Sequence, residues 1–406
     1  MSAGRLVIVG AGQAGLALAA KLRALKDMRP ITMLGAEDVA PYQRPPLSKK
    51  YLSGEMEFDR LLLRVPEWFA ENDIDLRLSS FVEEIDRNAK TVTLQDGSTI
   101  SYDTLALATG ATPRTLPAEI GGDLEGVYVM RAKRDADLLE KEMKEGRRLL
   151  VIGGGYIGLE AAAVAKKFGL SVTLIEMADR ILKRVASAET AAIMRAIHKE
   201  HGVAILENTG LKRLIGTQGR VVAAELSDST VIDVDAVIVG IGVSANDQLA
   251  GDCGLDVGNG IIVDEFVRTS DRSIYAVGDC TSLPWRGTRV RLESVQNAID
   301  QAEAAAVVMT GEEIAYDAKP WFWSDQYDVK LQIAGFNLGF DETVVREGAR
   351  PGSVSVWYFR QGQFVAVDAI NDAKAYATGK RLLDQGREPN RAVLADSAAD
   401  LKLLLA

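Results

Sequence analysis

The stretch RLVIVGAGQAGLALA, from Arg5 to Ala19, decides the fold of the first part of the chain. Its apolar run is typical of a buried parallel strand. Gly10, Gly12 and Gly15 follow at the G-x-G-x-x-G spacing, and a helical pattern begins there. Such glycines allow a tight turn, the approach of a pyrophosphate and close packing of helix on strand, and the helix N-terminus attracts phosphate. The stretch predicts a dinucleotide site, although a lone match is about as often a plain strand–helix turn.

A second copy of this pattern follows the apolar run 148–152, with Gly153, Gly155 and Gly158 at the same spacing. The next predicted strand ends at Glu176. An acid about 20 residues after the glycines is expected to hold a ribose 2′-hydroxyl. Because a carboxylate there would repel a 2′-phosphate, we expect this unit to prefer NADH to NADPH.

Two nucleotide units in one chain are far more specific than either alone. The economical interpretation is one fixed and one exchangeable coenzyme, a flavin and a nicotinamide. In the first unit, the predicted strand 31–34 runs towards Glu37, the candidate acid for the adenosine ribose. The alternative is that Glu37 is a solvated loop acid.

The composition excludes several classes of protein. A chain of 406 residues is expected to form two or three domains, and a net charge of −10 argues against nucleic-acid binding. Cys253 and Cys280 form no C-x-x-C pair, which fits a reducing cytosol. The N-terminal apolar run is too short for a signal peptide, and no segment has the length of a membrane span. We therefore expect a cytoplasmic protein with no membrane partner.

A proline-rich loop, PYQRPPLSK at 41–49, follows the first unit. The prolines stiffen it and forbid a helix until Leu47, and Ser48 could cap a short helix carrying Lys49. Such a loop is suited to holding Lys49 and Arg44 in place, although a lysine beside prolines is more often simply solvated.

Further elements follow the second unit. The run 274–280 predicts a strand ending at Asp279, which could bind ribityl hydroxyls or be a turn aspartate. The helix around 188–201 carries His198 and His201, for which a solvated role is favoured over metal binding, so no metal site is expected.

From Lys319 the composition changes. A cluster of Trp321, Phe322 and Trp323 precedes alternating runs typical of antiparallel strands, and two helical patterns follow at roughly 371–385 and 390–405. This predicts a third domain of α+β type. The tryptophans are most often core residues, although one ring could wall a flavin pocket.

Eight motifs mark the chain: GAGQAG, PYQRPPLSK, LALATGATPR, GGGYIGLE, VGIGV, IYAVGDC, ESVQNA and PWFWSDQ. With them, essentially the whole chain resembles the FAD-dependent, NADH-using ferredoxin reductases of the putidaredoxin reductase type. The resemblance implies an α/β fold with two Rossmann-like dinucleotide-binding domains, as in glutathione reductase, and a C-terminal α+β domain. The expected boundaries are 1–111 with 246–318 for FAD, 112–245 for NAD and 319–406 for the last domain.

The resemblance also implies site residues. Lys49, beside the flavin N5 and paired with Glu160, is the candidate catalytic group. Family members carry the ribose acid where this chain has Ala36, so Glu37 would act from the next position. The expected FAD contacts are Gly10, Gly12, Ala14, Gly15, Ala36, Glu37, Arg44, Lys49, Val82, Ala108, Thr109, Gly110, Arg131, Asp279, Val295 and Trp323. The expected NAD contacts are Gly153, Gly155, Tyr156, Ile157, Gly158, Glu176 and Gly242.

The implied reaction is hydride transfer from NADH to FAD, then two single-electron transfers to a [2Fe–2S] ferredoxin that feeds a cytochrome P-450 or another oxygenase. A local basic face would dock the acidic ferredoxin, with Lys330, Lys374, Lys380 and Arg381 as candidates.

Three alternatives stay open from the sequence. A disulfide-type or peroxide-reducing flavoprotein would need a thiol near the flavin, and the proline loop has none. The acceptor could instead serve a nitrite reductase or another oxygenase. The chain could also be a redox-sensing protein like apoptosis-inducing factor, which binds both coenzymes without fast turnover.

Overall fold

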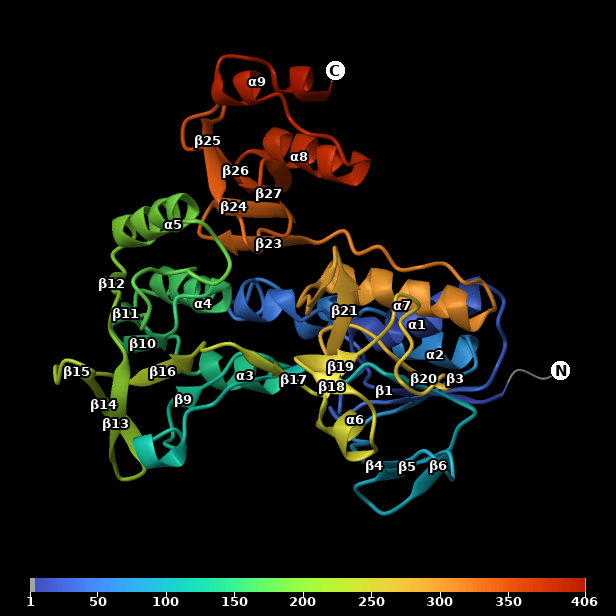
Figure 1. Ribbon diagram of the computed structural model, residues 1–406. Coiled ribbons are helices and arrows are strands. Elements are labelled where there is room, and N and C mark those ends of the chain that lie inside the picture. The colour runs from blue at the N-terminus through green and yellow to red at the C-terminus, as the bar shows by residue number, and fades with distance from the viewer. Residues whose placement is uncertain (1–3, 406) are drawn as a thin grey trace. The chain divides into compact units, whose positions relative to one another are not determined.

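The computed structural model describes residues 4–405, which form two compact units (Figure 1). Unit 1 comprises 4–43, Phe58–Thr112 and Val243–Pro320. Unit 2 comprises Arg44–Glu57, Pro113–Gly242 and 321–405. Each unit is therefore built from three separate stretches of chain. The predicted three-domain boundaries stay a prediction.

Unit 1 is organised around a five-stranded parallel sheet of order β20-β7-β1-β2-β3. Its central strand β1 is fully apolar and buried, as its sequence predicts. Helices α1 and α7 share the core of this unit with the sheet (Figure 1). The elements are β1 (Leu6–Val9), α1 (Gln13–Ala24), β2 (Ile31–Leu34), β3 (Ile74–Arg77), β7 (Thr104–Leu107), β20 (Ile274–Ala276) and α7 (Val295–Met309).

Smaller elements complete unit 1. Strands β5 and β6 form a hairpin around Asp96-Gly97, and β5 also pairs with β4. A second small sheet of this unit has the strand order β18-β19-β21-β22. The bounds are η2 (Phe58–Leu61), α2 (Pro66–Glu71), β4 (Val82–Asp86), β5 (Thr91–Leu94), β6 (Thr99–Ser101), β17 (Val243–Ala245), α6 (Gln248–Asp252), β18 (Val257–Gly258), β19 (Gly260–Ile262), β21 (Thr281–Trp285) and β22 (Thr288–Val290).

Unit 2 contains a second parallel sheet, of order β12-β11-β10-β16-β9. In both parallel sheets the strand order reverses beside the strand that precedes the glycines, where open α/β sheets bind ligands. A three-stranded antiparallel sheet, β13-β14-β15, packs in the same core. The bounds are β9 (Val127–Tyr128), α3 (Lys133–Glu140), β10 (Arg148–Ile152), α4 (Tyr156–Lys167), β11 (Ser171–Ile175), α5 (Ala188–Glu200), β12 (Ala204–Leu206), β13 (Leu211–Thr217), β14 (Arg220–Leu226), β15 (Val231–Asp233) and β16 (Ala236–Val239). The short elements η1 (Pro45–Ser48) and η3 (Ala118–Ile120) precede them, and β8 (Ala111–Pro113) runs from the end of a unit 1 stretch into unit 2.

The C-terminal part of unit 2 is an antiparallel sheet of order β23-β24-β27-β26-β25, with α8 packed against it. This confirms the predicted fold class, two Rossmann-like sheets and an α+β part. The bounds are β23 (Trp321–Gln326), β24 (Val329–Gly335), β25 (Glu342–Glu347), β26 (Val354–Arg360), β27 (Gln363–Ile370), α8 (Ala373–Gln385), α9 (Arg391–Ala395) and η4 (Leu401–Leu405).

The last predicted helix is wrong in extent. Instead of one helix over 390–405, α9 ends at Ala395 and a 3₁₀ helix follows. The buried Arg346 guanidinium donates to the carbonyls of Val393 and Leu394 at 2.9 and 3.1 Å. Because Arg346 already donates to those carbonyls, they do not need the N–H groups of a further helical turn, and the helix can end there.

Candidate functional site

The first glycine stretch forms a cradle at the carboxyl end of β1. A Cβ atom at Gly10, where φ is +118°, would lie 2.1 Å from the Ala108 carbonyl oxygen. One at Gly15 would lie 2.1 Å from the Gly10 oxygen. Gly12, the N-cap of α1, differs because a Cβ there would meet nothing within 4 Å. Space is therefore open above the free N–H groups of α1, as a pyrophosphate requires.

The second glycine stretch repeats this arrangement in unit 2. Cβ atoms at Gly153 and Gly158 would lie 2.4 and 2.3 Å from carbonyl oxygens, whereas one at Gly155 would meet nothing within 4 Å. Gly155 is the N-cap of α4. Both cradles have packed first and third glycines and an open middle glycine, so the residues present fit two dinucleotides.

Glu176 follows β11 at the edge of the second cradle. Its carboxylate accepts the backbone N–H of Gly154 at 2.8 Å and that of Ala178 at 2.8 Å. The acid is thus fixed beside the glycines by two charge-assisted bonds.

In unit 1, Glu37 has the corresponding place after β2. Its carboxylate accepts the Tyr42 hydroxyl at 2.7 Å. Ala36, the position before it, is exposed. The Glu37 carboxylate is therefore anchored by the start of the proline loop, a contact that its sequence does not signal.

The end of β7 is fixed by a residue that the sequence analysis missed. Thr109 donates its hydroxyl to the Asn246 carbonyl at 2.7 Å, and the Asn246 amide donates to the Thr109 carbonyl at 2.8 Å. Asn246 also donates its N–H to Gly110. No sequence pattern links positions this far apart.

The remaining predicted FAD residues of unit 1 lie on different elements. Ala14 is buried in α1 against Gly278, and Asp279 comes next after Gly278. Val82 begins β4, and Val295 begins α7 after the N-cap Ser294. Four predicted FAD residues belong instead to unit 2: Arg44, Lys49, Arg131 and Trp323.

Lys49 and Glu160 form the predicted ion pair within unit 2. The Lys49 Nζ lies 2.6 Å from the Glu160 Oε2, and the lysine also donates to the Pro45 carbonyl at 3.3 Å. The Glu160 side chain is 6% exposed and that of Lys49 is 17% exposed. Little solvent screens this pair, so a positive charge is held at a defined position.

Ser48 does not cap a helix, contrary to the prediction. It is the last residue of the short 3₁₀ helix η1, which has prolines in its first two positions, where no N–H is required. The Ser48 hydroxyl instead donates to Glu160 Oε2 at 2.9 Å. Tyr51 then holds the loop by donating to Asp137 of α3 at 2.6 Å.

The other predicted site residues of unit 2 lie on several different elements. Arg44 donates to the Arg131 carbonyl at 3.0 Å. Trp323 lies in β23 and is half-buried, tilted against Trp321 rather than enclosed in the core. Tyr156 and Ile157 begin α4, and Gly242 is exposed after β16.

The expectation of a solvated His198 is wrong. His198 is fully buried in α5, because the face of α5 that carries it packs under the hairpin between β23 and β24. Its ring nitrogens contact Gln326 and Tyr327. His201 is exposed and stacks on Tyr327.

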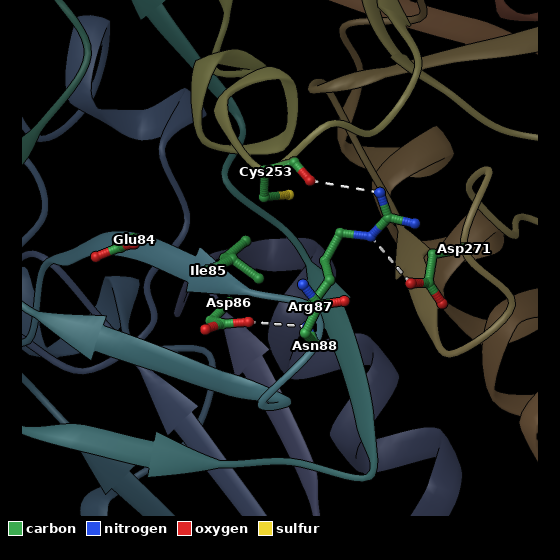
Figure 2. Close-up of a pocket in the computed structure, with 7 residues that line it drawn as sticks. All are labelled: Glu84, Ile85, Asp86, Arg87, Asn88, Cys253 and Asp271. Atoms are coloured by element: carbon green, nitrogen blue, oxygen red, sulfur yellow. Dashed lines mark hydrogen bonds and ion pairs between the residues drawn. The ribbon is translucent and has the colours of Figure 1, made fainter.

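A polar pocket of about 470 Å³ lies elsewhere in unit 1, and Figure 2 shows its lining. Arg87 crosses it and donates to Asp271 at 3.0 Å and to the Gly254 carbonyl at 2.9 Å. The lining residues are Glu84, Ile85, Asp86, Arg87, Asn88, Cys253 and Asp271, none of them a predicted site residue. Burial raises the pKa of the Cys253 thiol, and also that of the fully buried Cys280. Neither cysteine is in an environment that favours a reactive thiolate.

The basic residues proposed for docking differ in their neighbours. Lys374 pairs with Asp400 at 2.7 Å and Lys380 with Asp384 at 2.8 Å. For Lys330 and Arg381, both exposed, the described residues provide no ion pair. Only the latter two present unneutralised charge.

Comparison with known proteins identifies the family. The family described as pyridine nucleotide-disulphide oxidoreductase matches residues 4–302, and the reductase C-terminal family matches residues 321–405. The chain belongs to the pyridine nucleotide-disulphide oxidoreductases. Like them, it is a flavoprotein oxidoreductase that uses FAD and a pyridine nucleotide.

Its relatives within this family include putidaredoxin reductase and other ferredoxin reductases, and also rubredoxin reductases. The chain is 42% identical to rhodocoxin reductase of Rhodococcus erythropolis over 403 residues, covering 99% of this chain and 94% of that protein. It is 42% identical over 404 residues to the 5,5′-dehydrodivanillate O-demethylase ferredoxin reductase subunit of a Sphingobium strain, covering 98% of each. The structure matches the reductase of the covalent putidaredoxin reductase–putidaredoxin complex with a TM-score of 0.96 and 37% identity, covering 100% and 99% of the two chains.

No helix among residues 4–405 of this oxidoreductase is long and apolar enough to cross a membrane. Within the same residues, no group of three or more histidine, cysteine or acidic side chains is arranged to hold a metal ion.

Proposed function

We propose that this chain is an NADH-dependent ferredoxin reductase that supplies single electrons to a [2Fe–2S] ferredoxin serving a monooxygenase. The observation that carries the proposal is the pair of equivalent glycine cradles, one in each unit, in a chain whose relatives include ferredoxin reductases. When bound, FAD accepts a hydride from NADH and releases the two electrons singly.

The first cradle and its surrounding unit 1 residues would hold the FAD, and the second cradle would hold NADH. Glu176 supports NADH over NADPH because its carboxylate is fixed by two backbone N–H groups and cannot turn away from a 2′-phosphate. One carboxylate and one phosphate brought together would repel each other.

Lys49 would supply positive charge beside the flavin N5. The Glu160 carboxylate and the Pro45 carbonyl hold its ammonium group, so no reorganisation is needed when negative charge develops. This is electrostatic preorganisation by one fixed cation.

The thiol-dependent alternative receives no support. The chain has only Cys253 and Cys280, and burial raises the pKa of both. A disulfide-type or peroxide-reducing reaction needs a thiolate beside the flavin, and the Pro41–Lys49 loop offers a serine and a lysine instead. Both cysteines are free, which supports a cytoplasmic location.

The test is steady-state NADH oxidation by the purified flavoprotein with and without a candidate [2Fe–2S] ferredoxin. We expect slow oxidation alone and a large increase, on the order of 100-fold or more, with the cognate ferredoxin. Equally slow turnover with every ferredoxin tested would favour the redox-sensing alternative.

A second acceptor system is favoured by one specific observation. The Sphingobium relative is the reductase subunit of an O-demethylase, at the same identity as rhodocoxin reductase. Comparing ferredoxins from cytochrome P-450 systems with those from other oxygenases would decide between them, because the better acceptor has the higher kcat/KM.

A further inference from the structure

A chain of buried hydrogen bonds extends from Glu160 away from Lys49. Ser324 donates its hydroxyl to Glu160 Oε1 at 2.6 Å. Gln326 donates its amide to the Ser324 Oγ at 2.9 Å, and its Oε1 lies 2.7 Å from His198 Nε2. The His198 Nδ1 lies 3.1 Å from the Tyr327 hydroxyl. The residues thus connect the loop containing Lys49 to α5 through β23, all within unit 2.

The chemistry of each group fixes the direction of every bond. A carboxylate only accepts, so the Ser324 proton must point to Glu160. Ser324 then accepts, which requires the Gln326 amide nitrogen rather than its oxygen on that side. The Gln326 oxygen is left facing His198, so Nε2 of His198 must carry a proton.

The direction of the bond between His198 and Tyr327 follows from the burial of His198. The residue is fully buried, and this burial lowers the pKa of the imidazole. A neutral ring with its proton on Nε2 has a lone pair on Nδ1, which accepts the Tyr327 hydroxyl. All the donors therefore point one way, towards Glu160.

We propose that the hydrogen-bonded series of His198, Gln326 and Ser324 positions the Lys49–Glu160 pair, with Ser324 as its last member. Bonds of one direction polarise one another in a low-dielectric interior, so each donor strengthens the next and the carboxylate receives the sum. Ser324 and Ser48 occupy the two Glu160 oxygens, one from each side, and Lys49 completes the set. Without this series of hydrogen bonds, Glu160 is held from one side only. The ammonium group of Lys49 then loses its fixed position.

The alternative is that this network only joins α5 to β23. In that case the tautomer of His198 and the position of the Glu160 carboxylate would be independent of each other. The positioning proposal requires that they are coupled, and its importance for electron transfer rests on the proposed function.

The chain contains only two histidines, so nitrogen NMR of the imidazole rings can test the coupling in the flavin-loaded protein. A His201→Gln variant assigns the two rings. We expect His198 to be the neutral Nε2–H tautomer and to titrate below the ordinary range of histidine, because burial lowers its pKa. A ring that is protonated on Nδ1, or that titrates like an exposed histidine, would overturn the proposal.

Breaking the series of hydrogen bonds should be detected both at His198 and in the reduction of the flavin. Ser324→Ala should shift the His198 nitrogen signals and lower the rate constant of flavin reduction by NADH about tenfold at unchanged KM, the loss expected for one hydrogen bond to a charged group. Ser324→Thr, which keeps the hydroxyl, should restore both. Ser355→Ala removes a buried serine of the same sheet that bonds to Trp357, and it should change neither.

The outcomes separate the two proposals. If Ser324→Ala leaves both His198 and the reduction rate unchanged, or alters only thermal stability, positioning is rejected. If wild-type flavin is not reduced by NADH at all, the proposed function fails, while the NMR signals still report whether His198 and Glu160 are coupled.

Discussion

In the proposed mechanism, the electrostatics of the site depend on Lys49. Its ammonium group is held by a carboxylate and a carbonyl, and the carboxylate is itself held by two serines. The exposed pair of Lys167 and Glu55 has the same residue types but lies mostly in solvent. The difference in burial predicts different functional consequences for the two pairs.

Replacing Lys49 by alanine should slow reduction of the bound flavin by NADH by roughly 100-fold, the usual cost of losing one group that stabilises developing charge. Stopped-flow absorbance measures this rate constant directly. Lys167→Ala is the matched control and should leave it unchanged. An unaltered rate in Lys49→Ala would discard the role of this lysine.

Glu176 should determine the choice of coenzyme. Glu176→Ala is expected to lower kcat/KM for NADH by about 10- to 100-fold, since a hydrogen bond to a charged group is worth about 1.5–3 kcal/mol. The same variant should improve the ratio of NADPH to NADH activity. Glu225→Gln serves as control, because this β14 glutamate pairs with the exposed Lys212 and Arg213 of β13. A preference that survives in Glu176→Ala would assign the selectivity to other residues.

At the scale of elements, the two strand–glycine–helix cradles can each be blocked by a single side chain that the fold itself tolerates. Gly12 and Gly155 have φ of −106° and −80°, and a Cβ atom at either meets nothing within 4 Å. The fold therefore accepts a side chain there, whereas a pyrophosphate does not.

Valine at these two positions should have different effects. Gly12→Val is expected to give a folded protein that has lost its flavin absorbance. Gly155→Val should keep the flavin but raise the KM for NADH at least tenfold. Circular dichroism checks folding. Loss of flavin from Gly155→Val, with retention in Gly12→Val, would mean that the cofactor assignment is reversed.

The contact of α5 with β27 contains a buried carboxyl group that should make stability depend on pH. Asp368 accepts the Thr190 hydroxyl at 2.8 Å and that of Tyr358, and its other oxygen has no partner among the described residues. Burial raises the pKa of Asp368 to about 7. The folded protein therefore holds a proton that the unfolded chain releases near pH 4.

The sign of the effect follows from this difference. Between about pH 4 and 7 the folded state binds more protons, so this group makes the free energy of unfolding fall as pH rises, by on the order of 2 kcal/mol from pH 5 to 8. Denaturant unfolding of Asp368→Asn should show a smaller decrease than wild type. Asp325→Asn, which changes an exposed residue of β23, should retain it. Parallel pH profiles for wild type and Asp368→Asn would contradict a raised pKa.

At the scale of the whole molecule, both parallel sheets could be predicted because a buried strand is a continuous apolar run and the glycine spacing marks its end. The Lys49–Glu160 pair came from resemblance to a family. The sequence did not reveal Asn246, Ser324 or the burial of His198, because a hydrogen bond between distant positions leaves no periodic signal. The alternation of Ser324 and Gln326 on one face of β23 was the only trace, and polar residues on an inner face are not recognised by hydrophobic patterns.

The net charge of −10 also has a consequence at this scale. A chain so acidic can attract an acidic ferredoxin only through a local basic surface, so docking should weaken with salt. We expect KM for ferredoxin to rise roughly threefold or more between low and high ionic strength. Charge reversal of Lys330 or Arg381 should raise KM at low salt, whereas reversal of Lys212, which is paired with Glu225, should not. A KM independent of salt would exclude electrostatic docking.

The most direct test of two coenzymes acting in one chain is an anaerobic titration of the purified yellow protein with NADH, followed by addition of oxidised ferredoxin. We expect stoichiometric NADH to bleach the flavin bands and ferredoxin to restore them while its own cluster is reduced. A protein that binds no flavin, or whose flavin bands are unchanged by NADH, would contradict the proposed function.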